Sequence, residues 1–216
     1  MNSHILFIDT ETTDIPKRWD LPYSETGNWP SAVQISWIIC SAEGTEIKRE
    51  NHYVFEEDLE IAERSLKVHG ITRDFLKIYG KSRKDVLKIL IDDIQKYAPL
   101  ITGHFIEFDL HVLGTDLFRA GLENPFKNSF FYCTMLKSKQ YIFNPRIEYM
   151  RLPQLYNHLF GETMENSHNA LIDAEITAKC FFEIDRKAKI SEKDFNDIHW
   201  AVFKKIKFPT SKIISI

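Results

Sequence analysis

The sequence has few cysteines and no long apolar run, and each shortage excludes a class of protein. Its three cysteines, Cys40, Cys133 and Cys180, stand far apart. They lack the paired spacing of zinc sites, and an odd number cannot complete a disulfide framework. We therefore expect buried thiols in a reducing cytoplasm. No run approaches the roughly eighteen apolar residues of a membrane span, and the first residues lack the pattern of a signal peptide, so no membrane association is expected.

The sequence also lacks a strong net charge. The value of −3 over 216 residues gives no general affinity for nucleic acid, although a local patch or bound metal ions can still provide one. Residues 186–216 contain eight Lys/Arg and three Asp/Glu, a local balance of +5 that leaves −8 for the rest. This segment also carries Trp200, Phe203 and Phe208. We predict a domain over residues 1–185, followed by a basic tail over residues 186–216 that is docked or binds a partner.

Hydrophobic periodicity predicts an α/β fold with a mixed sheet of five strands flanked by helices. The expected strands cover residues 5–9, 33–40, 45–55, 100–103 and 130–134. The expected helices cover 61–69, from Ser82 to just before Pro99, the stretch around 109–121, 152–160 and about 169–187. The first strand is apolar on both faces, which is typical of a central strand.

Two carboxylates follow that apolar strand. Asp9 and Glu11 are two residues apart on an extended segment, so both side chains project from the same face. Held together, they repel each other unless a cation lies between them. Oxygen ligands of this kind suit Mg²⁺ or Mn²⁺ better than zinc. An isolated Asp-x-Glu is also typical of a solvated strand end, so the interpretation depends on further acids.

Further acids and a histidine occur at two later positions. Asp109 lies in the first turn of a predicted helix, where an acid also simply suits the helix dipole. Asp173 heads the apolar face of another helix, where a carboxylate is unfavourable unless it is paired or bound to metal. His168 precedes it by five residues. Together these groups provide the carboxylates and the base of near-neutral pKa that two-metal phosphodiester hydrolysis requires.

Three segments of the chain resemble the motifs of the DEDDh exonucleases, a family that includes the proofreading epsilon subunit of bacterial DNA polymerase III. They are Phe7-Ile-Asp-Thr-Glu-Thr-Thr13, Gly103-His-Phe-Ile-Glu-Phe-Asp109 and His168-Asn-Ala-Leu-Ile-Asp173-Ala. Two accessory segments, 68–72 and 151–155, also resemble the family, and the likeness spans about residues 5–185.

The resemblance implies an RNase H-like fold and 3′→5′ release of nucleoside monophosphates from single-stranded ends, with two Mg²⁺ or Mn²⁺ ions. It implies that Asp9, Glu11, Asp109 and Asp173 bind the metals and that Glu11 and His168 are catalytic. It also implies that Thr12, Thr13, His69 and Phe105 contact the substrate. Two residues depart from the pattern: Phe105 stands where relatives often carry Asn, and Cys133 where many carry Asp.

Three readings of the function remain open. The first is a DNA exonuclease of proofreading or repair, which has a DNA polymerase as its candidate partner and is favoured because the accessory segments look most like that branch. The second is an exoribonuclease that trims RNA. The third is a non-catalytic subunit that binds nucleic acid or a polymerase; the intact set of acids argues against it, while the basic tail supports it.

Overall fold

A computed structural model describes residues 3–164 and 168–206 of the chain. Its centre is a five-stranded sheet in the order β3-β2-β1-β4-β5. The strands are β1 (His4–Thr12), β2 (Ala32–Ser41), β3 (Glu46–Tyr53), β4 (Leu100–Gly103) and β5 (Phe130–Cys133). β1 pairs antiparallel with β2 and parallel with β4. The prediction of a mixed five-stranded sheet flanked by helices is confirmed, with β1 at its centre.

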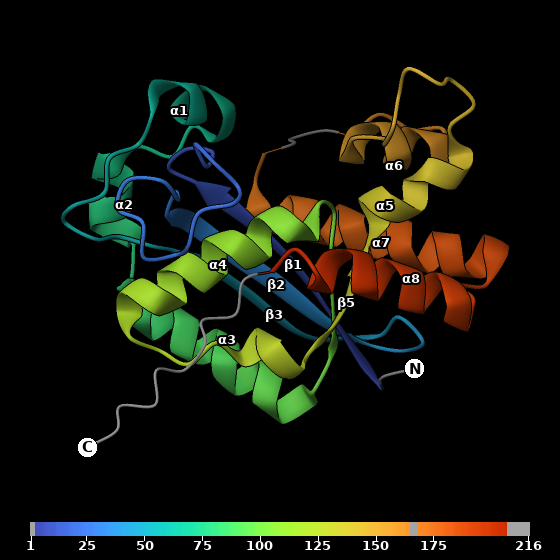
Figure 1. The fold of residues 1–216 in the computed structure, drawn as a ribbon, viewed down its shortest axis with the longest axis horizontal. Coiled ribbons are helices and arrows are strands. Elements are labelled where there is room, and N and C mark those ends of the chain that lie inside the picture. Colours follow the sequence, from blue (N-terminus) through green and yellow to red (C-terminus); the bar gives the residue numbers. More distant parts are fainter. Residues whose placement is uncertain (1–2, 165–167, 207–216) are drawn as a thin grey trace.

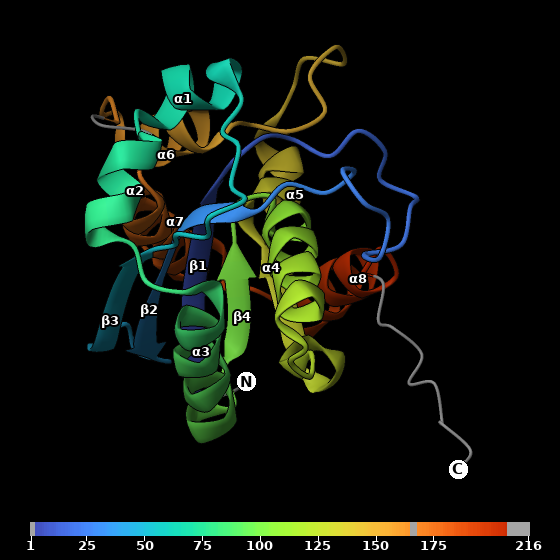
Figure 2. The same ribbon diagram turned by 90° about the vertical axis from the view of Figure 1, so that its left-hand side faces the viewer.

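Helices cover both faces of the sheet (Figures 1 and 2). α3 (Arg83–Tyr97) and α4 (Ile106–Ala120) lie on one face, and α7 (Ala170–Ala188) lies on the other. α1 (Glu63–His69), α2 (Arg73–Tyr79), α5 (Thr134–Ser138) and α6 (Leu152–Phe160) surround the end of the sheet toward which β1 runs. The carboxyl end of β1 therefore lies in an opening between α1 and α6.

The packing of β1 fixes α7 in register with the strand. Phe7 is fully buried, and its ring contacts those of Phe181 and Phe182 edge-on, with centroids 5.5 and 5.6 Å apart. Such aromatic pairs add about 0.5–1.5 kcal/mol each to the free energy of area burial. Because alternate residues of a strand share a face, Asp9 and Glu11 point to the same side as Phe7, toward α7.

The sequence predicted most of the longer elements well and missed three α-helices, two of them short. α6 has the predicted bounds, α7 lies within a residue of them, and α4 ends at Gly121 in the left-handed conformation that suits glycine (φ 64°). α2 and α5 were not predicted, because seven and five residues are too few for a helical period to show. The three cysteines are free and buried, as expected.

The helix α8 (Glu192–Phe203), which was also not predicted, packs against the edge strand β5. The buried His199 accepts a hydrogen bond at Nδ1 from the Phe131 amide, 3.2 Å away, and so satisfies one donor of the sheet edge. Lys137 of α5 forms an ion pair of 3.0 Å with Asp194 of α8 and so ties these two helices together. Phe208, one of the aromatic residues singled out in the tail, lies outside the described residues, and the boundary at residue 185 stays a prediction.

Within residues 3–164 and 168–206, no helix combines the length and apolarity that crossing a membrane requires.

Candidate active site

The two faces of β1 supply different parts of the site. Asp9 and Glu11 face α7, while Thr10 between them points the other way. The Thr10 hydroxyl donates a hydrogen bond of 2.7 Å to Oδ1 of Asp109, which is 3% exposed. Thr10 thus fixes an acid that comes from α4, ninety-nine residues further along the chain. The sequence analysis did not single out Thr10, since nothing local marks its partner.

α4 reaches β1 because β4 is short. β4 pairs with β1 only as far as Phe7 and ends at Gly103, so the last residues of β1 are open on that side. A Cβ atom on Gly103 would lie 3.2 Å from the carbonyl oxygen of Ile8 and still closer to Ile106. The glycine therefore allows the chain to turn closely past β1 into α4, and this turn brings Asp109 beside the carboxylates.

Side-chain amides anchor the start of α7. Asn169 caps the helix by accepting hydrogen bonds from Leu171 and Ile172, at 3.1 and 3.4 Å. Gln34 is fully buried on β2 opposite Glu11, and its Oε1 accepts a hydrogen bond of 3.2 Å from the Ala170 amide. Gln34 thereby fixes the turn that carries His168 and Asp173. Its place in an otherwise apolar strand was the only signal in the sequence.

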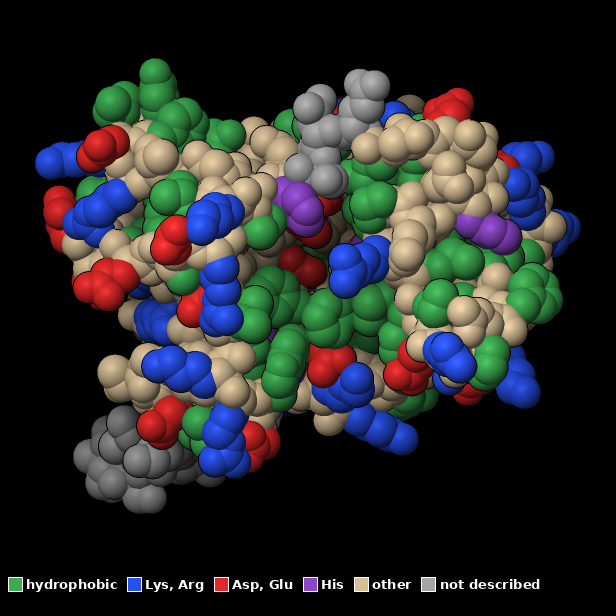
Figure 3. Space-filling model, turned by 90° about the horizontal axis from the view of Figure 1, so that it is seen from above, with side chains coloured by type: hydrophobic (Ala, Val, Ile, Leu, Met, Phe, Trp, Pro, Cys, Tyr) green, Lys and Arg blue, Asp and Glu red, His purple; other side chains and the backbone are tan. Residues whose placement is uncertain are grey.

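Three predicted ligands meet in one cluster. Carboxylate oxygens of Asp9, Glu11 and Asp173 all lie within 4.8 Å of one another. Asp109 adjoins the group, and its charge acts on both Asp9 and Glu11. Figure 3 shows acidic side chains at the bottom of a hollow in the face that it displays, with histidine at the rim. The structure thus places all four predicted acids at one point of the sheet.

The electrostatics of the cluster are those of a site that needs cations. Burial, followed by the neighbouring carboxylates, raises the pKa of Asp9 well above its usual range and that of Glu11 to about 8. Burial likewise raises the pKa of Asp109 to about 7 and that of Asp173 to about 6. Oδ1 of Asp173 is buried without a hydrogen-bond partner. An unsatisfied oxygen among repelling acids fits the donor set of Mg²⁺ or Mn²⁺.

Two histidines stand at the rim of the cluster. His168 is exposed, has a left-handed backbone (φ 71°) and donates its amide to Oδ2 of Asp173 at 3.3 Å. His69 is partly buried, and its pKa is lowered by burial and by the nearby His168. Its Nδ1 accepts from the Ile71 amide at 3.0 Å, so Nε2 carries the proton toward the Thr12 carbonyl, 3.2 Å away. His69 is thereby held as a neutral ring.

The remaining predicted contact residues lie around the same opening. The Thr12 hydroxyl donates to the Asp14 carbonyl at 2.7 Å, and the Thr13 hydroxyl accepts from the Ser31 amide at 3.0 Å. Both side chains are buried, so these hydroxyls already serve the turn after β1. Phe105 is partly exposed at the start of α4. Their contacts with substrate stay predictions.

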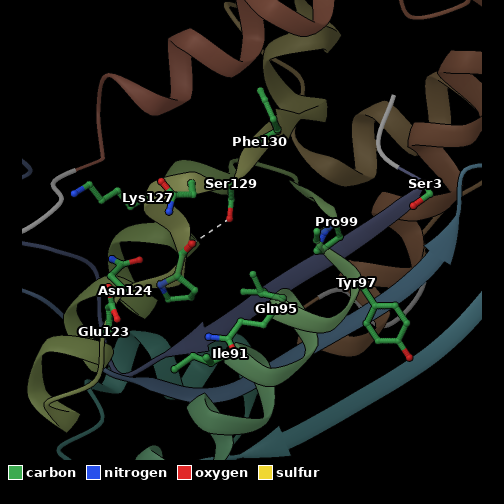
Figure 4. A pocket seen from close by; sticks show the side chains of 14 residues that line it. Ser3, Ile91, Gln95, Tyr97, Pro99, Glu123, Asn124, Lys127, Ser129 and Phe130 are labelled. Carbon is green, nitrogen blue, oxygen red and sulfur yellow. Dashed lines mark hydrogen bonds between the residues drawn. The ribbon is translucent and has the colours of Figure 1, made fainter.

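A second hollow, of about 680 Å³, lies at the opposite end of the sheet (Figure 4). Ser3, Pro99 and Phe130 line it at the amino ends of β1, β4 and β5, whereas the carboxylates stand at the carboxyl end of β1. Glu123 is the only acid among its lining residues, and Ser129 is engaged with the Pro125 carbonyl at 3.3 Å. The described residues that line this hollow therefore lack the cluster of acids that metal-assisted hydrolysis requires.

A carboxylate cluster at the end of the central strand of a mixed five-stranded sheet defines the class: an RNase H-like nuclease fold with a site for divalent metal ions. The RNase T exonuclease model matches residues 6–181. The chain therefore belongs to the RNase T family of exonucleases, which are metal-dependent phosphodiester hydrolases. The predicted family is confirmed at this level; the closer likeness to the polymerase epsilon subunit stays a prediction.

Solved structures of exonuclease I share the fold. One is a zinc-bound complex of Escherichia coli exonuclease I with single-stranded DNA: 17% identity, TM-score 0.70, covering 87% of this chain and 41% of that one. The complex of the same enzyme with a dA16 oligonucleotide has 17% sequence identity and a TM-score of 0.71, and the match covers 91% of this chain and 43% of that one. A further exonuclease I structure has 18% identity and a TM-score of 0.70, and the match covers 86% of this chain and 41% of that one. This chain thus spans less than half of these proteins. No curated protein sequence matches it.

Proposed function

We propose that this chain removes nucleoside monophosphates from the 3′ ends of single-stranded DNA by two-metal-ion hydrolysis. The observation that carries the proposal is the meeting of Asp9, Glu11 and Asp173 within 4.8 Å, with Asp109 fixed beside them by Thr10. A purely structural site gains nothing from four mutually repelling acids. Bound divalent ions would neutralise these acids and supply Lewis acidity to the phosphodiester.

The residues of this chain then have distinct tasks. Asp9 and Asp173 hold the metals between β1 and α7, and Asp109 extends the donor set from α4. Glu11 is a metal ligand at the end of β1, on the same face as Asp9, and we assign it a catalytic part there. His168 stands outside the helical turns with an exposed side chain, so its imidazole can take the proton of the attacking water while Asp173 stays fixed.

The preference for DNA and for the 3′ end rests on likeness. Two of the exonuclease I structures that share the fold contain nucleic acid: one was solved with single-stranded DNA and the other with a dA16 oligonucleotide. The same proposal includes a role in proofreading or repair with a DNA polymerase as partner, which follows from the family resemblance. It also includes a partner-binding tail and a cytoplasmic location, which follow from the composition. An exoribonuclease would differ from a DNA exonuclease in recognising the 2′-hydroxyl of its substrate. An assay with both nucleic acids distinguishes the two activities directly.

The test is release of mononucleotides from matched single-stranded DNA and RNA labelled at either end, with Mg²⁺, Mn²⁺ or EDTA. We expect early release of the 3′ label from DNA, abolished by EDTA and by Asp9→Asn. Asp92→Asn, at an exposed acid on α3, is the matched control and should keep full activity. Faster release from RNA would assign the exoribonuclease. Activity that survives Asp9→Asn would refute the site.

A further inference from the structure

The long connection between β1 and β2 places an aromatic side chain over the start of α4. Trp19 belongs to this connection, residues 13–31, and is 40% exposed. Its ring lies 5.8 Å from that of Phe105 and 6.2 Å from that of Phe108 (centroid distances). Phe105 and Phe108 are themselves stacked at 6.3 Å. A loop far from α4 in sequence thus meets it in an aromatic cluster.

Trp19 is held in a fixed position. The buried Asn28 clamps the neighbouring residue: its Oδ1 accepts from the Arg18 amide at 3.0 Å and its Nδ2 donates to the Arg18 carbonyl at 2.9 Å. The ring of Trp19 also meets Trp29 edge-on at 6.1 Å, and Trp29 is buried. An exposed aromatic ring that the fold holds so firmly is prepared for contact with a ligand.

Phe105 has a backbone conformation that bulky residues rarely adopt. Its φ is 66°, in the left-handed region, where the Cβ atom of a non-glycine residue crowds the backbone. Such strained residues gather where a ligand is bound. Phe105 directly precedes α4, and Asp109 lies in the first turn of that helix. The strained residue therefore stands at the end of α4 that carries a carboxylate of the metal site.

We propose that Trp19 and Phe105 form a stacking platform for a base of the single-stranded substrate, next to the nucleotide under cleavage. This inference rests on the proposed function. Single-stranded nucleic acids are bound by aromatic rings that stack on bases and by cations that contact the backbone. Lys17 and Arg18, both exposed, directly precede Trp19. Figure 3 shows hydrophobic side chains gathered beside the hollow of the carboxylates.

A nucleic-acid strand fits this surface better than a protein partner does. Trp19 is 40% exposed and Phe105 is partly buried. The exposed area of these two rings is far smaller than the roughly 800 Å² that each partner buries in a stable protein complex. One or two bases need no larger area. Stacking is also independent of base identity, as an exonuclease that degrades any sequence requires.

The test measures binding apart from cleavage. Fluorescence anisotropy of labelled single-stranded DNA gives Kd on the Asp173→Asn background with Mg²⁺, so substrate is not consumed. We expect Trp19→Ala to raise Kd about tenfold, which corresponds to about 1.4 kcal/mol. Trp19→Phe should restore most of the affinity. Phe118→Ala, at a 47% exposed phenylalanine near the other end of α4, is the matched control and should leave Kd unchanged.

Oligonucleotides with one abasic residue decide whether stacking is the cause. At the position that contacts the platform, the missing base should weaken binding by the parent protein, and Trp19→Ala should then add no further loss. Phe105→Asn, which accepts the left-handed backbone, should reproduce the loss without disturbing α4. An equal effect of Trp19→Ala on every abasic oligonucleotide, or a Kd within twofold of the parent, would overturn the platform. Absence of nucleotide release by the unmodified chain would instead refute the proposed function.

Discussion

Replacing one acid of the cluster should stabilise the metal-free protein while removing its activity. In Asp173→Asn the shape of the side chain is kept, and the amide oxygen can still accept the hydrogen bond from the His168 amide. The buried charge disappears, and with it the repulsion that Asp173 exerts on Glu11 and Asp9. A ligand of a metal site thus destabilises the fold until the metal binds.

The pKa of Asp173 gives the magnitude. It rises from 3.8 to about 6, chiefly through burial, and each unit corresponds to about 1.36 kcal/mol. The charged side chain therefore lowers the free energy of unfolding by about 3 kcal/mol. In a chain of this size, 1 kcal/mol moves Tm by roughly 2–4 °C. We expect Asp173→Asn to raise Tm by about 6–12 °C in EDTA.

The sign of the pH dependence follows from the raised pKa. Below pH 3.8 the carboxyl is protonated in both the folded and the unfolded chain, so the two proteins should be equally stable. Between pH 3.8 and about 6 the folded chain holds a proton that the unfolded chain has released, and the penalty grows with pH. Above about pH 6 it is complete, so the gain from Asp173→Asn should be largest there.

Thermal unfolding of both proteins in EDTA and in Mg²⁺, from pH 3.5 to 8, measures all of this. Mg²⁺ should raise the Tm of the parent chain, because a ligand of the folded state stabilises it, and should barely move that of the variant. Asp92→Asn controls for loss of a negative charge as such. A variant that melts below the parent in EDTA at pH 8, or gains as much from Mg²⁺, would refute the assignment of Asp173.

Three further outcomes are expected. His168→Gln should lower the hydrolysis rate most near neutral pH and recover part of the loss at higher pH; a pH–rate profile parallel to that of the parent would contradict its role as base. The partly buried His104, whose pKa falls to about 4 through desolvation, should make the fold lose stability as pH drops from about 6.5 to 4, by about 3 kcal/mol. Urea titrations of the parent and of His104→Gln, which should lack this dependence, measure the difference. Asp116→Asn should lower the free energy of unfolding in urea by about 3–5 kcal/mol, because the fully buried Asp116 pairs with Arg83 and Arg119, each at 3.1 Å; a loss below 1 kcal/mol would show that the network relaxes.

The sequence predicted the elements whose periodicity is long enough to recognise. β1 was recognisable as an apolar run that ends in acids. α7, a helix of nineteen residues, was recognisable by the apolar stripe along it. α8 was harder to predict, because its buried residues pack against β5, and the sequence did not show that β5 has an open edge. Only aromatic residues such as Trp200 and Phe203 indicated that the tail docks.

The acids that meet in the cluster were predictable, but the residues that support them were not. Asp9, Glu11 and Asp173 could be chosen from residue type and spacing. Thr10 and Gln34 could not, because their partners, Asp109 and Ala170, lie 99 and 136 residues away in sequence. Such contacts depend on strand order and register, which periodicity alone does not give.

The register of β1 joins the core and the site in one constraint. The face of β1 that meets α7 carries Phe7, Asp9 and Glu11. Thr10 lies on the opposite face, which meets α4. A slip of one residue would exchange the two faces: the acids would lose Asp173, and Asp109 would lose the Thr10 hydroxyl. The tight packing of Phe7 on Phe181 and Phe182 makes that slip unfavourable. This aromatic packing therefore also holds four repelling carboxylates in the arrangement that divalent metal ions require.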